Sequence, residues 1–411
     1  MIIENFEHLL TKYAELITKV GVNVQPGQTI ILYSDVHTAH LAELISSSAY
    51  ALGANEVIVK WSDAPVQRDF LEHTSDQRLE THYEFEKKAA EELMAKRASR
   101  ISLISQAPDA FAGIDPKRLQ MYQTTYSKVK QPVTKATMNN DISWLVVAAA
   151  SPEWAKIVFP DLETDDALTK LWQAIFTICR VDQPDPVAAW KNHINFLTER
   201  AEWLNNYQFD ALHYHSPKTD LFVGLPKDHH WEGAGSHDGS GNFFVPNIPT
   251  EEVFTAPDFK RIDGTVSSTL PLSYNGQIIE GLTLTFKNGQ ITNATADEGE
   301  ELLNHLIQTD NGSKSLGEVA LVPEDSPIAT AKTIFYNTLF DENASDHLAI
   351  GAGYPFSIKN GTSMSRADLQ KAGLNDSTVH VDFMVGSSDM NINGITKDGE
   401  AIPIMKNGIW A

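Results

Sequence analysis

The chain has almost no cysteine, since Cys179 is the only one among its 411 residues. A single thiol cannot form an internal disulfide, so the fold must be held by its packed core and not by cross-links. Cys179 lies in the apolar helical run LWQAIFTICR. In that setting a buried structural thiol is expected, and a reactive nucleophile is not.

Basic residues are also scarce, with 32 Lys and Arg against 54 Asp and Glu and a net charge of −22. Nucleic acids and anionic membranes attract proteins through basic surface patches, so neither is expected as a partner. No apolar run approaches the roughly 18 residues of a membrane-spanning helix. The first segment, MIIENFEHLL, is acidic and amphipathic and does not resemble a secretion signal, so a cytoplasmic location is expected.

The glycine motif of dinucleotide-binding folds is missing after the first predicted strand, residues 29–33. The chain there nonetheless alternates between strand and helix patterns. A helix is predicted at residues 37–52, and a second strand follows at residues 56–61. A strand–helix–strand unit of this length is typical of a parallel α/β layer.

The length of 411 residues predicts two domains, and the composition changes near Tyr207. We predict an N-terminal α/β domain with a parallel sheet at residues 1–205. The remainder, residues 206–411, is predicted to be a mixed α+β domain that carries the functional site. One predicted hairpin is the alternating segment LTLTFKNGQITNA. The Asn-Gly turns that mark the second domain are Asn275–Gly276, Asn288–Gly289 and Asn360–Gly361.

The strongest candidates for chemistry are polar residues set into apolar segments of this second domain. In STVHVDFMVGSSDM, an alternating strand places His380 and Asp382 on one face, two residues apart. An imidazole and a carboxylate on one wall of a sheet can hold a divalent cation. Val381 and Phe383 lie on the opposite face and leave the burial of the polar pair open, whereas Met384 favours it.

Acidic residues in three other segments could join this pair. Glu318 in SLGEVALVP is a carboxylate within an apolar strand, which is costly to bury unless it is paired or bound to metal. Its neighbours Leu316 and Ala320 are expected on the same face and favour an inward position. Glu342 and His347 flank a predicted helix start in FDENASDHLAIGAGYPF, which also carries Tyr354.

The adjacent pair Glu251 and Glu252 in VPNIPTEEVFTAPD has two open interpretations. In an extended segment, neighbouring side chains face opposite ways, so only one of the two could reach a given site. Alternatively, Thr250 caps a short helical turn whose positive end attracts the acidic residues.

The same domain holds three further polar groups that could bind a metal. For pairs of this kind, hydrogen-bonded packing or a surface position is the more frequent role. The groups are His213 with His215, His229 with His230, and His237 with Asp238.

The motifs NIPTEEVFTAPD, LGEVALVP, LFDENASDHLAIGAGYP and VHVDFMVGS closely resemble those of one metallopeptidase family. It is the aminopeptidase T, aminopeptidase S and PepS family, metallopeptidase family 29. The likeness covers essentially the whole chain, including a PGQ turn near the N-terminus and the segment TDLFVGLP. The resemblance implies two adjacent divalent cations in the C-terminal domain, an N-terminal α/β domain, and a homodimer that encloses an inner cavity.

Position by position, the resemblance also implies a set of site residues. It favours Glu252 over its neighbour, and it marks Tyr354 as an active-site tyrosine. Zinc or cobalt is the implied metal, and imidazole and carboxylate ligands are also compatible with manganese or magnesium. The implied metal ligands are Glu252, Glu318, His347, His380 and Asp382, with Glu342 as a further acidic position.

We therefore expect a metalloaminopeptidase that hydrolyses N-terminal residues from peptides. Two cations about 3.5–4 Å apart can activate a shared water. Glu318 or Asp382 is expected to bridge them, Glu318 or Glu342 to act as general base, and Tyr354 to stabilise the oxyanion.

Two alternatives stay open. A glycoside hydrolase could use Glu252 and Glu318 as its acid and base, but it would leave the imidazoles without a role and would survive a chelator. A metal-stabilised peptide-binding protein would bind the cations without turnover.

Overall fold

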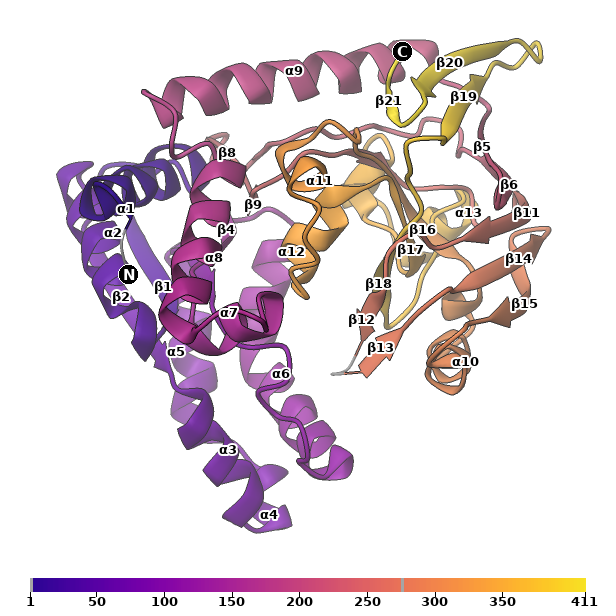
Figure 1. Ribbon diagram of the computed structural model, residues 1–411. Helices are drawn as coiled ribbons and strands as arrows, with labels where there is room; N and C mark the ends of the chain where they lie inside the picture. The colour runs from indigo at the N-terminus through magenta and orange to yellow at the C-terminus, as the bar shows by residue number, and fades with distance from the viewer. Residues whose placement is uncertain (1–2, 275–276) are drawn as a thin grey trace. The chain divides into compact units, whose positions relative to one another are not determined.

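The computed structural model describes residues 3–274 and 277–411, and Figure 1 shows its elements. The chain divides into two compact units. Unit 1 comprises Met1–Asn192 and Gly235–Pro249, and unit 2 comprises His193–Ala234 and Thr250–Ala411. The division falls inside helix α9 (Pro186–Tyr207), which also contains the expected boundary at residue 205. The placement of that boundary stays a prediction.

Unit 1 contains the parallel sheet predicted from the strand–helix alternation. Its strand order is β2-β1-β3-β4-β9, and every neighbouring pair is parallel. The chain places β2 on one side of β1 and then crosses back to place β3 on the other side, so the winding reverses between β1 and β3. The strands are β1 (Thr29–Asp35), β2 (Glu56–Ser62), β3 (Ser99–Ile104), β4 (Trp144–Ala148) and β9 (Asn247–Ile248).

Several helices of unit 1 begin where a polar side chain caps the first turn. Asp63 accepts a hydrogen bond from the Val66 amide, and Ser151 accepts one from the Trp154 amide. Helix α6 runs on to Met138 although Pro132 lies inside it. The helices are α1 (Phe6–Leu16), α2 (Ala39–Ala51), α3 (Ala64–His73), α4 (Asp76–Leu79), α5 (Glu84–Ala95), α6 (Pro116–Met138), α7 (Pro152–Val158) and α8 (Thr164–Ile178). Two short strands, β7 (Ser236–His237) and β8 (Phe243–Phe244), pair with each other.

Unit 2 is built mainly from two antiparallel sheets, as expected for a mixed α+β domain. The larger sheet has the order β15-β14-β11-β6-β5-β19-β20-β21, and the smaller has the order β10-β16-β17-β18. The strands of the larger sheet are β5 (Ala211–Ser216), β6 (Thr219–Gly224), β11 (Ile262–Ser267), β14 (Thr283–Lys287), β15 (Gln290–Thr295), β19 (Asn391–Ile395), β20 (Ala401–Lys406) and β21 (Ile409–Trp410). Those of the smaller sheet are β10 (Val253–Thr255), β16 (Leu316–Leu321), β17 (His347–Gly351) and β18 (His380–Met384).

The remaining elements of unit 2 are short. They include the paired strands β12 (Leu272–Tyr274) and β13 (Gln277–Ile279), and the helices α10 (Glu300–Ile307), α11 (Pro327–Ala331), α12 (Thr338–Asp341) and α13 (Arg366–Lys371). Within the described part of the chain, no helix has both the length and the apolar character that crossing a bilayer requires.

The Asn-Gly turns of unit 2 differ in what they connect. Asn288 and Gly289 have φ values of 50° and 79° and join β14 to β15, so the predicted hairpin is confirmed. Asn360–Gly361 instead leads into the 3₁₀ turn Gly361–Ser363 and joins no strands. Asn275–Gly276 lies outside the described residues.

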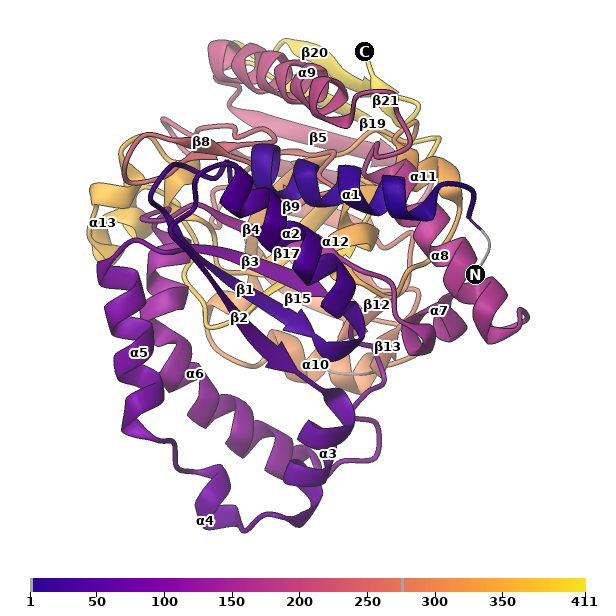
Figure 2. The same ribbon diagram turned by 90° about the vertical axis from the view of Figure 1, so that its left-hand side faces the viewer.

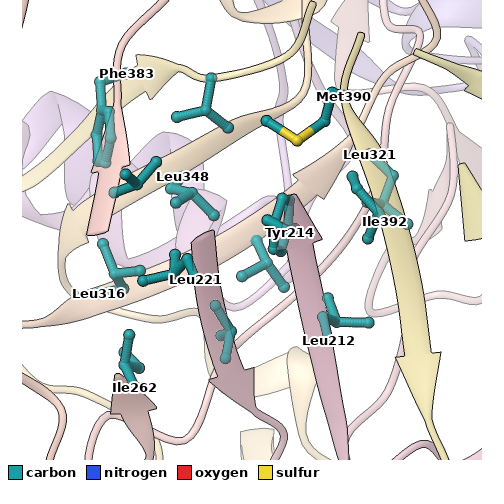
Figure 3. Packing of buried hydrophobic residues seen from close by; sticks show 14 of the residues in the cluster. Leu212, Tyr214, Leu221, Ile262, Leu316, Leu321, Leu348, Phe383, Met390 and Ile392 are labelled. Carbon is teal, nitrogen blue, oxygen red and sulfur yellow. The ribbon is translucent and has the colours of Figure 1, made fainter. Parts of the chain in front are cut away.

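The core of unit 2 receives side chains from both of its larger antiparallel sheets (Figure 3). Leu212, Tyr214 and Leu221 come from the larger sheet and are fully buried. Leu348 and Phe383 come from the smaller sheet and pack into the same cluster. One face of the smaller sheet is therefore fixed against the core, which leaves its other face for polar side chains.

Candidate metal centre

The smaller sheet carries the predicted polar residues on one face. Glu318 on β16 pairs with Ala349 on β17, and Ala349 pairs in turn with Asp382 on β18. His347 lies two residues before Ala349, and His380 lies two residues before Asp382. Because side chains alternate along a strand, all four polar side chains lie on the same face as Ala349. The small methyl group of Ala349 leaves space between the two carboxylates.

The opposite face of the same strands is apolar and belongs to the core. Val319, Leu348, Val381 and Phe383 all lie in the hydrophobic cluster of unit 2. The question that the sequence left open for His380 and Asp382 is thus answered: their apolar neighbours face the core, and the polar pair is half-buried on the other side.

The side chain of Leu316 does not follow the simple alternation that was expected around Glu318. The pairing register of β16 and β17 shifts between Leu316 and Glu318, and Leu316 packs in the core opposite Ile350. The expectation that Leu316 and Glu318 share a face is therefore wrong. A β-bulge inserts one residue and inverts the side-chain direction beyond it. Gly317 occupies this position, where an added Cβ would lie 2.2 Å from the Ala352 carbonyl oxygen.

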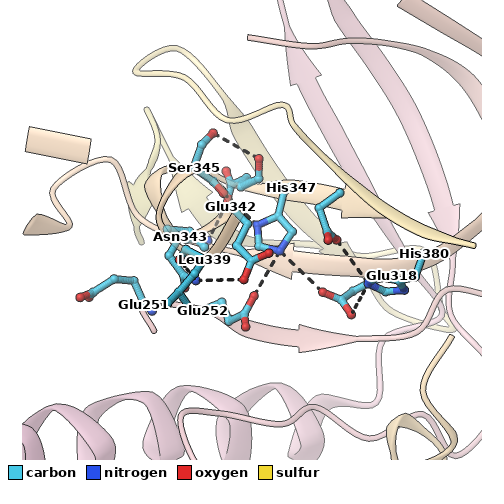
Figure 4. A network of polar contacts seen from close by, with 12 residues as sticks. Glu251, Glu252, Glu318, Leu339, Glu342, Asn343, Ser345, His347 and His380 are labelled. Carbon is cyan, nitrogen blue, oxygen red and sulfur yellow. Dashed lines mark hydrogen bonds and ion pairs between the residues drawn. The ribbon is translucent and has the colours of Figure 1, made fainter. Parts of the chain in front are cut away.

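Glu318 belongs to two groups of potential metal ligands (Figure 4). Its Oε1 is 3.6 Å from His347 Nε2, and its Oε2 is 3.7 Å from His380 Nε2. Glu252 completes the first group, with its Oε2 3.1 Å from His347 Nε2. Asp382 completes the second, with its Oδ1 3.4 Å from His380 Nε2. Within each group the ligand atoms all lie within 4.8 Å of one another.

Backbone carbonyl groups orient both imidazoles. His347 Nδ1 donates to the Ser345 carbonyl at 3.1 Å, and His380 Nδ1 donates to the Ala352 carbonyl at 2.7 Å. Since Nδ1 carries the hydrogen in both rings, Nε2 is the ligand atom that faces the carboxylates. Histidines that bind metals are usually held in this way.

The burial of these residues makes their charges mutually dependent. Burial, together with the nearby carboxylates Asp382 and Glu252, raises the pKa of Glu318, although a hydrogen bond with His347 opposes the rise. Burial alone would lower the pKa of His347, but Glu252 and Glu318 hold it well above its usual range. Burial opposes the charged form of His380 as well, yet Asp382 and Glu318 raise its pKa to about 10.

The donor set fits divalent cations. When all four are ionised, the carboxylates of Glu252, Glu318, Glu342 and Asp382 carry more negative charge than the two imidazole rings could offset, even with both rings protonated. Uncompensated charges of this kind cost several kcal/mol each when buried. Asp382 Oδ1 is buried and accepts no hydrogen bond from any residue that the structure describes. Imidazole nitrogen and carboxylate oxygen, without thiolate, are ligands for zinc, cobalt or manganese.

Glu342 and Tyr354 border the two groups without belonging to either. Glu342 lies on the 3₁₀ turn Glu342–Ala344 after α12, and His347 begins β17, so the helix start predicted between them is wrong. Burial, followed by the charges of Asp382 and Glu252, holds the pKa of Glu342 well above its usual range. The Tyr354 ring lies 5.0 Å from the His380 ring and stacks on Phe356 at 5.1 Å.

The pair Glu251–Glu252 is extended, with no helical turn at residues 250–252. The capped-turn interpretation is therefore wrong. Glu252 faces His347, whereas the Glu251 carboxylate lies 3.4 Å from His193 Nε2. Opposite directions for neighbouring side chains are those expected of an extended segment.

The other three histidine groups make their contacts with residues outside this cluster. His213, His215 and Asp220 do gather, and His213 Nε2 is 2.7 Å from Asp220 Oδ1, but the group is largely exposed. His229 is buried, and its Nδ1 donates a hydrogen bond to the Pro226 carbonyl. Asp238 accepts the backbone amides of Ser240 and Asn242 and so stabilises a turn.

Several residues that shape the centre are invisible to sequence reasoning. Ala349 looks like an ordinary core residue of an apolar strand. Ser345 and Ala352 contribute through their backbone carbonyl groups, which every residue has. Asn343 is fully buried and accepts the Glu251 amide with its side-chain oxygen at 2.8 Å. The one local signal in the sequence is the polar residue Asn343 directly after Glu342.

Comparison with known proteins identifies the family of the chain. Residues 6–410 match the model of the family described as thermophilic metalloprotease (M29). The chain is 51% identical to aminopeptidase PepS of Streptococcus thermophilus, with 100% of both chains covered. It is 48% identical to aminopeptidase AmpS of Bacillus subtilis, over 99% of this chain and 100% of that one. Its structure matches wild-type AmpT from Thermus thermophilus with a TM-score of 0.93 and 36% identity, covering 99% of this chain and 100% of that one. The chain therefore belongs to the thermophilic metalloprotease (M29) family, and it is a peptide hydrolase.

Proposed function

We propose that the protein is a metal-dependent aminopeptidase that removes N-terminal residues from peptides at a dinuclear centre. The observation that carries the proposal is the position of Glu318, which faces one imidazole with each of its two oxygens. A carboxylate shared by two ligand groups is the arrangement expected of a bridging ligand. The relatives named aminopeptidase PepS and aminopeptidase AmpS support the exopeptidase assignment.

The residues divide into two sets of three around the shared carboxylate. Glu252, Glu318 and His347 would hold one cation, and Glu318, His380 and Asp382 would hold the other. Bound there, divalent cations would supply Lewis acidity and a water of lowered pKa. The donors favour zinc, cobalt or manganese.

Glu342 is proposed to carry the proton. It lies outside both ligand groups, and among the described residues its carboxylate accepts only one long hydrogen bond, 3.4 Å from the Asn343 side-chain amide. That carboxylate is therefore available to accept a proton from the attacking water and to deliver it to the leaving amine. The negative charge of the cluster would also attract the free amino group of a peptide substrate.

Tyr354 is proposed to donate a hydrogen bond to the oxyanion that develops on the scissile carbonyl. Its hydroxyl forms no hydrogen bond with any of the residues that the structure describes. Burial and then the carboxylates of Glu318 and Asp382 raise its pKa well above the usual value, so the phenol keeps its proton. A protonated phenol close to the cluster is a suitable donor.

Replacing Tyr354 with Phe removes this donor and leaves the stacked ring in place. We expect Tyr354→Phe to lower kcat by about 100-fold, the scale found when one oxyanion donor is lost, with a small change in KM. Steady-state kinetics on an aminoacyl aminocoumarin would measure both values. Unchanged turnover would remove Tyr354 from the mechanism.

The proposed activity can be tested with matched substrates. Aminoacyl aminocoumarins with a free amine should be cleaved, and the same compounds with an acetylated amine should not. Cleavage should stop with EDTA and return when cobalt or zinc is added.

Each alternative predicts a different result. A glycoside hydrolase would be insensitive to the chelator, and a binding protein would cleave neither compound. The homodimer and the cytoplasmic location expected from the sequence stay predictions.

A further inference from the structure

Unit 1 contains a cavity of about 730 Å³ that the proposed peptidase activity does not use. Side chains from β1, β2, β3, α3 and α6 line it, and Figure 2 shows these elements. Its volume lies within the roughly 300–1,000 Å³ of small-molecule sites. A smaller hollow of about 190 Å³ adjoins it and shares Ser62, Gln67 and Gln106.

The cavity lies where the sheet of unit 1 reverses its winding. Tyr33 is on β1, and its partner Ser102 is on β3, the strand placed by the reversed crossover. In open parallel sheets, ligands bind beside the carboxyl ends of the strands at such a reversal. Ser62 and Gln106, which lie at or just beyond the ends of β2 and β3, connect the cavity to that edge.

The charge of the cavity is opposite in sign to that of the whole protein. Four cationic side chains contribute to its lining, against the two carboxylates of Asp63 and Glu86, in a chain of net charge −22. Such a local excess of positive charge attracts anions. The cations are Lys60, Arg78, Arg100 and Lys130.

Arg100 and Lys130 both lie over the ring of Tyr33. Arg100 Cζ lies 5.9 Å from the centre of the Tyr33 ring, and Lys130 Nζ lies 5.6 Å from the same centre. Within the described part of the chain, Arg100 donates only to the hydroxyl groups of Ser102 and Thr137. Among the described residues, no carboxylate lies within 4.0 Å of either cationic group.

The positive charges of Arg100 and Lys130, both near the Tyr33 ring, repel each other, and an anion bound between them would offset this repulsion. Desolvation lowers the pKa of Arg100, and desolvation together with the charge of Arg100 lowers the pKa of Lys130. Half-buried Arg100 offers a planar fork for a carboxylate or phosphate, and Lys130 remains accessible to solvent. Tyr122 and Tyr126, stacked at 5.5 Å, add an aromatic wall for the body of a ligand.

We propose that this cavity is a second ligand site, which binds a small organic anion. Arg100 and Lys130 hold its carboxylate or phosphate group, and the tyrosines contact an apolar or aromatic body. Carboxylates of this kind include amino acids and short peptides, which peptide hydrolysis releases, whereas phosphates come from other compounds. The site is independent of the proposed metal ligands, all of which belong to unit 2.

Calorimetric titration of the metal-loaded, full-length protein would test the site with three probes. N-acetyl-L-phenylalanine supplies a carboxylate, phenyl phosphate supplies a phosphate, and N-acetyl-L-phenylalaninamide is the neutral control. We expect at least one anion to bind at millimolar concentration or below, and the neutral amide not to bind. The anion that binds more tightly identifies the source of the natural ligand. No binding of either anion, or equal binding of the amide, would overturn the proposal.

Variants would locate the binding. Arg100→Gln and Lys130→Gln should each weaken it by about tenfold or more, as expected for a lost hydrogen bond to a charged group. Lys130→Arg should restore it, and Lys128→Gln, an exposed lysine on the same helix, should leave it unchanged. Unaltered melting temperatures would show that the variants are folded. Glu318→Gln should still bind the probe, and loss of binding there instead would place the anion at the metal-ligand cluster and contradict the proposal.

Discussion

Glu318→Gln is expected to abolish peptide hydrolysis almost completely. The substitution keeps the shape of the side chain but removes the negative charge that both ligand groups share. Residues that only orient metal ligands typically contribute about 10–100-fold to affinity or activity. A residue that belongs to both groups should exceed that range, so we expect kcat/KM to fall by more than about 100-fold.

The measurement is kcat/KM on an aminoacyl aminocoumarin, combined with the metal content of the purified variant. Glu324→Gln is a matched control, because Glu324 is a half-buried carboxylate that follows the same strand, β16, and belongs to neither ligand group. The control should retain its metal and its activity within a few fold. Activity retained by Glu318→Gln would contradict the bridging role.

Removal of the cations is expected to destabilise the protein as well as inactivate it. Without them, the clustered carboxylates repel one another in a buried setting. A cation present at 100 times its dissociation constant stabilises the folded state by about 2.7 kcal/mol. For a unit of this size, that corresponds to a rise in melting temperature of about 5–10 °C.

Thermal unfolding of chelator-treated protein, before and after reloading with zinc or cobalt, would measure this rise. Glu318→Gln provides the control, since its two ligand groups are both incomplete and its melting temperature should respond less to the metal. An equal rise in both proteins would mean that the stabilising cation binds elsewhere. No rise in the wild-type protein would argue against the centre.

Local periodicity was sufficient to predict much of the fold. The buried run at residues 29–33, the amphipathic helix after it and the strand at residues 56–61 specify their own secondary structure, and they form the parallel layer of unit 1. The Asn288–Gly289 hairpin followed from the left-handed conformations that asparagine and glycine adopt easily. These features depend only on neighbouring residues.

The parts that sequence reasoning missed depend on pairing between distant segments. The bulge at Gly317 turns the side chain of Leu316 to the opposite face of the sheet, and no local sequence pattern predicts this bulge. Segment Gly235–Pro249 joins unit 1 because β9 pairs with β4, far away in the sequence. Ala349 matters only because its two neighbours across the sheet are Glu318 and Asp382.

The candidate ligands were predictable as residue types but not as an assembly. A carboxylate or imidazole within an apolar strand is unusual, and this local feature was enough to mark Glu318, His380 and Asp382. Motif resemblance, and not alternation, selected Glu252 over Glu251. Sheet order then brings together residues from four separate strands or strand ends.

Anomalous X-ray scattering from crystals loaded with zinc or cobalt would test the central claim most directly. The account predicts two strong peaks per chain on either side of the Glu318 carboxylate. One should contact Glu252 and His347, and the other should contact His380 and Asp382. A single peak, or peaks bound by other side chains, would contradict the assignment of a dinuclear centre bridged by Glu318.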